Sequence, residues 1–104
     1  MPAAFFVVRA TVTDPAKRAA FDTWYTKDHL PDAVKSFGAT RASRFRSATD
    51  PSAHLAMYEF ADQAALDRAV NGAEMKRLVA DFNRAWPEVT RTREVLVLAE
   101  TFGV

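Results

Sequence analysis

The sequence contains no cysteine among its 104 residues, which excludes disulfide bonds, a thiol nucleophile and cysteine-based zinc or iron–sulfur sites. It also lacks an excess of charge, because 14 Lys and Arg residues against 13 Asp and Glu residues leave a net charge of +1. That balance gives no general attraction to nucleic acid or to an anionic membrane. The apolar runs are too short to span a bilayer. We therefore expect neither nucleic acid nor a membrane among its partners.

The motifs that bind phosphates and metals are missing as well. There is no Gly-rich phosphate loop, and the chain has only 3 glycines in all, so nucleotide binding is not expected. The 2 histidines and the scattered carboxylates show no metal-ligand spacing. We therefore expect no metal site.

What the sequence does have is enough apolar surface for one core. Apolar residues make up 49% of the chain, which fits one domain over residues 1–104. The first apolar run, residues 3–12, has no basic segment before it and predicts a strand rather than a signal peptide. These features predict a single cytoplasmic domain.

Apolar periodicity predicts strands and helices in the order βαββαβ. We expect strands at residues 3–12, 40–47, 53–61 and 91–101, and helices from Pro15 to about residue 30, at 31–37, at 63–71 and at 73–85. The first helix is predicted to break at Leu30, because a residue before proline avoids helical dihedral angles. Gly38 suits the end of the helix that follows.

This order predicts an α+β fold with a four-stranded antiparallel sheet in the ferredoxin-like arrangement, since connections are short and right-handed. The first and third strands would be central, and both carry apolar residues on both faces. In such a fold the helices cover only one face of the sheet. We therefore expect a homodimer that packs sheet against sheet.

The stretch "FDTWYTKDHLPD", which covers residues 21–32, straddles the predicted break. With the βαββαβ order it resembles the dimeric α+β barrel superfamily, and it is most similar to the EthD-like group. The signature of that group is a Trp followed by His-x-Pro, here Trp24, His29 and Pro31. The resemblance implies a homodimer with a hydrophobic cavity between sheet and helices, which takes a small apolar ligand.

The same superfamily includes cofactor-free monooxygenases, muconolactone isomerases, polyketide cyclases, haem-degrading enzymes and proteins with no known activity. The resemblance thus implies a cofactor-independent protein without choosing the reaction. One hypothesis is a cofactor-free isomerase, cyclase or lyase, or monooxygenase-like enzyme that acts on a small hydrophobic or aromatic molecule. The alternative is a non-catalytic dimeric module that binds a hydrophobic ligand or has a structural or stress-response role.

His29 is the candidate catalytic residue, because imidazole titrates near neutrality and can transfer a proton. Asp28 and Asp32 flank it and could orient the ring. Its other interpretation is a cap or packing residue at the helix end. The candidate substrate-binding residues share an aromatic character: Phe21, Trp24 and Tyr25 before His29, and His54 and Tyr58 on the third strand. If the face of His54 and Tyr58 meets the helices, both line the cavity; otherwise they are structural.

Overall fold

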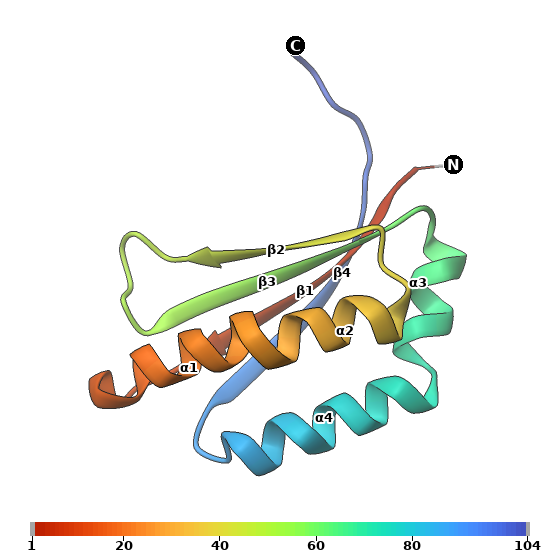
Figure 1. Cartoon of the computed structure of the whole chain (residues 1–104). Helices are drawn as coiled ribbons and strands as arrows, with labels where there is room; N and C mark the ends of the chain where they lie inside the picture. Colours follow the sequence, from red (N-terminus) through yellow and green to blue (C-terminus); the bar gives the residue numbers. More distant parts are fainter. Residues whose placement is uncertain (1, 104) are drawn as a thin grey trace.

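The computed structural model describes residues 2–103 as one sheet covered by helices (Figure 1). The strands are β1 (Ala4–Thr11), β2 (Arg41–Arg46), β3 (Ala53–Phe60) and β4 (Thr90–Val97), and the helices are α1 (Arg18–Trp24), α2 (Leu30–Phe37), α3 (Gln63–Val70) and α4 (Ala73–Ala85). A short 3-10 helix (Pro15–Lys17) precedes α1, and a π-helical turn (Tyr25–His29) joins α1 to α2. The predicted element order is confirmed.

The four strands form one antiparallel sheet in the order β2-β3-β1-β4. β1 and β3 are the central pair, with Phe6 opposite Tyr58 and Ala10 opposite His54. This is the predicted ferredoxin-like α+β arrangement, and it explains why these two strands are the most apolar. A central strand is covered by neighbours on both edges and needs apolar side chains on each face that is buried.

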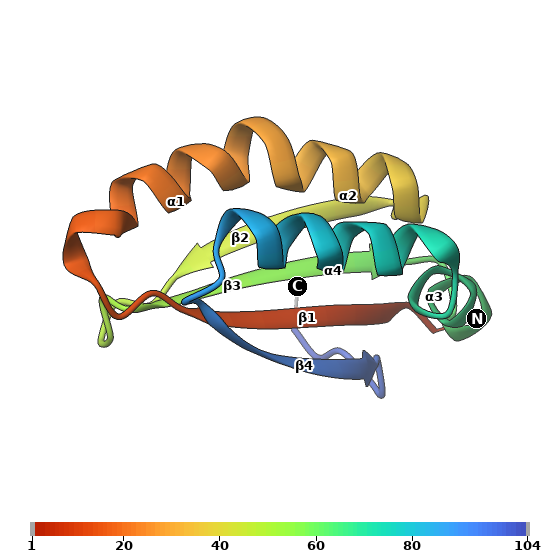
Figure 2. The same cartoon turned by 90° about the horizontal axis from the view of Figure 1, so that it is seen from below.

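All the helices lie on one side of the sheet or at its end, as Figure 2 shows. Alternate residues on the helix side, such as Phe6, Ala10 and Tyr58, are buried. The register places six large apolar side chains on the opposite face: Phe5, Val7, Phe45, Leu55, Met57 and Leu96. Among residues 2–103, no helix has the length and hydrophobicity needed to cross a membrane.

The predicted helix break at Leu30 is wrong. Leu30 has helical angles, φ −63° and ψ −48°, and its N–H donates to the carbonyl of Tyr25, five residues back. The turn therefore widens by one residue instead of ending. Pro31 has no N–H to donate, and a wide turn is a common way for a helix to pass such a site. Gly38 ends α2 in the left-handed conformation at φ 67°, as predicted.

The last strand is shorter than predicted, ending at Val97 rather than residue 101. Val97 lies opposite Ala4, the first residue of β1. One more bond, from the Leu98 N–H to the Ala3 carbonyl at 3.0 Å, closes the ladder. Beyond it the central strand offers no further partner, and Phe102 is 87% exposed.

Candidate active site

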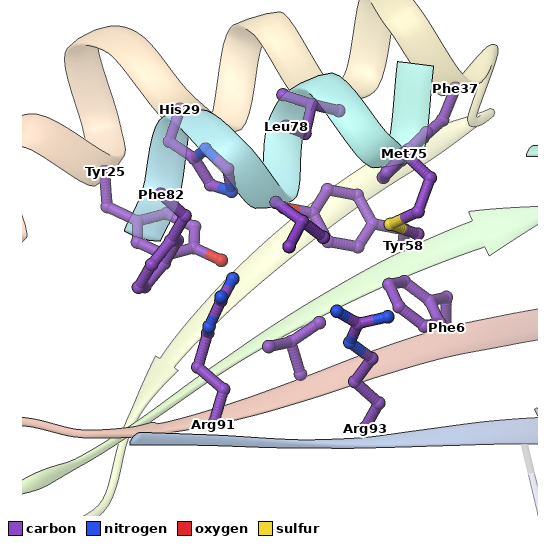
Figure 3. A pocket seen from close by; sticks show the side chains of 12 residues that line it. Phe6, Tyr25, His29, Phe37, Tyr58, Met75, Leu78, Phe82, Arg91 and Arg93 are labelled. Carbon is purple, nitrogen blue, oxygen red and sulfur yellow. The ribbon is translucent and has the colours of Figure 1, made fainter. Parts of the chain in front are cut away.

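A cavity lies between the helix layer and the sheet, at the side where β4 forms the edge. Its walls are mostly apolar and come from β1, β3, β4, α2, α4 and the π-helical turn. They comprise Phe6, Val8, Tyr25, His29, Phe37, Tyr58, Met75, Leu78, Val79, Phe82, Arg91 and Arg93 (Figure 3). The free space inside is about 30 Å³, which is room for about one or two water molecules. The residues thus form a tight apolar cavity with one imidazole, two phenols and two guanidinium groups.

His29 comes from the π-helical turn and is held by aromatic rings. It stacks on Trp24, with ring centroids 4.8 Å apart and an interplanar angle of 17°. Phe82 meets it edge-on at 5.3 Å and Tyr25 at 4.9 Å. Within residues 2–103, no side chain or backbone group hydrogen-bonds to either ring nitrogen. Ring packing therefore fixes the imidazole, and its nitrogens stay available to a ligand.

Neither flanking carboxylate orients His29 as the sequence suggested. Asp32 accepts hydrogen bonds from Ser36 Oγ at 2.9 Å and from Arg77 Nη2 at 2.9 Å. Asp28 is exposed. Asp32 acts on His29 only through its charge.

Burial, followed by the positive charge of Arg91, lowers the pKa of His29 from 6.5 to about 4. Asp32 and Asp81 oppose this shift, whereas Arg77 adds to it. The imidazole is therefore uncharged at neutral pH and carries one nitrogen lone pair. In this state it is a proton acceptor.

Two phenols, Tyr25 and Tyr58, lie against the same cavity. Burial raises the pKa of both, and the neighbouring Tyr25 raises that of Tyr58 further. Both hydroxyls are therefore protonated at neutral pH. A neutral phenol can donate a hydrogen bond to an oxygen that gains negative charge.

His54 faces the helices, which answers the question that the sequence left open. It is buried, but it does not line the cavity. Its ring packs under Tyr25 at 4.5 Å and edge-on against Phe21 at 5.5 Å. Its Nε2 accepts a hydrogen bond from Arg44 Nε at 3.0 Å. Burial, followed by the charge of Arg44, lowers the pKa of His54 to about 4.

Arg44 ties the strand that carries it to the first helix. The guanidinium pairs with Asp22, donates to Thr26 Oγ1 and lies 5.3 Å from the Tyr25 ring centroid. Arg46 adds a second contact to Asp22 at 2.7 Å. These bonds fix the position of the π-helical turn over the sheet, and with it His29.

The aromatic wall predicted before His29 differs from the observed one. Phe21 and Trp24 do not line the cavity, because they pack behind it against Trp86, at 5.2 and 6.0 Å. Their place is taken by side chains of α4, a segment that the sequence analysis predicted only as a helix: Met75, Leu78, Val79 and Phe82. Only Tyr25, His29 and Tyr58 of the six predicted site residues meet at the cavity.

Sequence reasoning missed Arg91 and Arg93 as cavity residues. Arg91 and Arg93 are two residues apart on β4, so their side chains lie on the same face of the strand. The register places them opposite Ala10 and Val8, on the helix side of the sheet. The signal was present as two arginines on one face of a strand whose continuation, "VLVL", is apolar. As for metals, no cluster of three metal-binding side chains occurs in residues 2–103.

The sheet topology and the helix layer place the chain among proteins with a ferredoxin-like α+β fold. No protein-family model matches the sequence, and no curated protein matches it. Solved structures match over nearly the full chain. SnoaB from Streptomyces nogalater, described as a cofactor-independent oxygenase, is 18% identical with a TM-score of 0.71, covering 97% of each chain.

Two further structures have the same architecture. An EthD family protein from Bacillus halodurans is 19% identical with a TM-score of 0.69, covering 92% of this chain and 97% of that one. A protein of unknown function from Nitrosomonas europaea is 23% identical with a TM-score of 0.68, covering 100% and 96%. At this level of identity the likeness shows a shared fold, the ferredoxin-like α+β fold.

Proposed function

We propose that this protein is a cofactor-free enzyme that transfers a proton on a small hydrophobic or aromatic molecule, with His29 as the base. One observation carries the proposal: an uncharged imidazole with no protein hydrogen-bond partner lies in the wall of an apolar cavity. A half-buried base held by packing, without a competing partner, is a typical preorganised catalytic group.

The chemistry follows from the charges. A nitrogen of His29 takes a proton from an acidic C–H or O–H of the ligand, which leaves imidazolium and an enolate or phenolate. Tyr25 and Tyr58 both stay protonated and line the same cavity, and we assign a phenol hydroxyl of this pair as the hydrogen-bond donor to the new oxyanion. The same burial that keeps His29 neutral makes the imidazolium a strong acid, which returns the proton to the original or a neighbouring atom. Return to a neighbouring atom is an isomerisation, and an intramolecular reaction of the anion is a cyclisation.

The size of the cavity sets a condition on this function. An apolar cavity that takes benzene measures about 150 Å³, whereas about 30 Å³ is free here. A ligand must therefore displace lining side chains. Arg93, which is exposed, is long enough to move aside, as is Met75, whose unbranched chain adapts to irregular shapes. The tight cavity also favours the second candidate function, a non-catalytic dimeric module whose cavity is simply a well-packed core.

A panel of phenols, lactones and linear polyketide mimics, without added metal or flavin, distinguishes the two candidates. In D₂O the enzyme is expected to exchange one acidic carbon-bound hydrogen, or to form product, with at least one class; NMR follows both and an oxygen electrode reports O₂ consumption. A ligand that binds in the cavity with neither exchange nor turnover across the panel would favour the non-catalytic module.

The proposed active form is a cytoplasmic homodimer that buries the outer sheet face. Phe45 and Leu96 on that face are 47% and 40% exposed, and apolar patches of this kind mark interfaces. Met57→Lys at its centre should weaken the dimer by at least about 10-fold, because an unpaired charge would be buried. Sedimentation of both proteins over a concentration series measures this. Phe102→Lys, on the exposed terminal segment, is the control. A wild type that sediments at 11.6 kDa at micromolar concentration would contradict the proposed dimer.

A further inference from the structure

Two arginines bring positive charge to a cavity that is otherwise apolar. Arg91 and Arg93 are two residues apart on β4, so their side chains leave the same face of the strand about 7 Å apart. Figure 3 shows both guanidinium groups directed from β4 into the space below His29 and Tyr58. The guanidinium carbon of Arg91 lies 3.8 Å from the Phe82 ring centroid.

Neither guanidinium has a carboxylate partner in the part of the chain that the structure describes. Arg91 donates to the Asn83 side-chain oxygen, a neutral group. By contrast, the arginines of β2 are paired: Arg41 with Glu59, and Arg44 and Arg46 with Asp22. Arg91 is half-buried, and burial together with the charge of Arg93 lowers its pKa. Two like charges are thus held side by side, and no described acidic group pairs with them.

We propose that the ligand of this cavity is a hydrophobic carboxylic acid, whose carboxylate binds between Arg91 and Arg93. This inference rests on the proposed function for the cavity and names the substrate class. Arginine forks match carboxylate oxygens in geometry and in charge. With the carboxylate at the β4 edge, a planar apolar body extends between Phe6, Val8 and Phe37. His29 then faces the body of the acid rather than its carboxylate.

Binding of such an acid also tunes the base. The charge of Arg91 is the second cause that holds the pKa of His29 down. A carboxylate placed on Arg91 offsets that charge, and the pKa of His29 rises toward neutrality. The ligand thus makes its own general base stronger when it binds.

Matched probes test the inference. The negatively charged 2-naphthoate is compared with its neutral, isosteric amide, 2-naphthamide, by calorimetry. NMR of the arginine Nε–H and imidazole signals locates each ligand. The wild type is expected to bind 2-naphthoate about 10- to 100-fold more tightly than the amide. The Arg91→Gln/Arg93→Gln variant should lose that preference while it still binds the amide. The control Arg68→Gln, which removes one arginine charge from the exposed face of α3, should keep the preference for 2-naphthoate.

Each other outcome overturns the inference. Equal binding of acid and amide in the cavity overturns the preference for acids and leaves the proposed function standing. A preference that survives the double arginine substitution places the carboxylate elsewhere. Tighter binding of 2-naphthyl phosphate than of 2-naphthoate assigns the pair to phosphate esters instead. If no probe binds in the cavity, both this inference and the cavity's place in the proposed function fail.

Discussion

Replacing His29 with alanine is expected to slow turnover by about 10²–10⁴-fold on a substrate that the wild type converts, which is the usual contribution of a positioned base. The physical reason is that no other neutral nitrogen base lines the cavity among the described residues. The loss should appear in kcat and in solvent–deuterium exchange. Stability should change less, because His29 is partly exposed and its substitution removes one stacked ring contact with Trp24, on the order of 1 kcal/mol.

The matched control is His54→Gln, which changes the other histidine. Gln can still accept the hydrogen bond from Arg44, but it loses the ring that packs against Tyr25 and Phe21. This variant should melt at a lower temperature and keep most of its turnover, because His54 does not line the cavity. Full turnover in His29→Ala, or loss of turnover only in His54→Gln, would show that His29 is a structural residue of the helix.

The free energy of unfolding is expected to fall steeply as the pH drops from about 6.5 to about 4. Both histidines have a pKa near 4 in the folded protein and near 6.5 in an unfolded chain. Between these values the unfolded state binds more protons, so acidification favours unfolding. Each histidine lowers the free energy of unfolding by on the order of 3 kcal/mol as the pH falls through this window. Together they approach the whole stability of a typical small domain.

Urea unfolding at pH 7, 5.5 and 4.5 measures this effect. His54→Gln should flatten the dependence by about half, since one of the two titrating groups is gone. Hydrogen bonds from Arg46 and Arg77 lower the pKa of Asp22 and of Asp32, respectively, from the usual range. The stabilisation from these two carboxylates is therefore lost only at a lower pH than that of the histidines. A free energy of unfolding that stays constant from pH 7 to 4.5 would contradict the burial of the two histidines.

Sequence patterns predicted the fold because its determinants are local. The two-sided apolar character of β1 and β3 placed them at the centre of the sheet. Gly38 marked the end of α2 because glycine readily adopts the left-handed backbone conformation. The break at Leu30 failed because the pre-proline preference is weak against the packing of the flanking helices. The preference of a residue before proline does not take into account that a helix can continue through a wider turn.

The site was predicted only in part, because its composition depends on contacts between distant segments. His29, Tyr25 and Tyr58 were found from chemistry and aromatic spacing. Arg91 and Arg93 become cavity residues only through the register of β4 on β1. Phe21 and Trp24 share a helix with His29, and Trp24 stacks on its ring, yet α4 supplies the apolar wall of the cavity instead. The packing of α4 decides which aromatic side chains line the cavity. The sequence around His29 alone does not contain this information.

The wide turn has a consequence for the phase of the whole helix. Phe21 and Phe37 are 16 positions apart, and in an uninterrupted α-helix they would point about 160° away from each other. The wide turn at Tyr25–His29 contains one residue more than an α-helical turn. It therefore reduces the angle between Phe21 and Phe37 by about 100°. Both ends of the helix can then face the same flat sheet. The wide turn thus corrects the phase of the helix. If the same residues formed a regular α-helix, one half of the helix would be rotated by about 100° relative to the sheet.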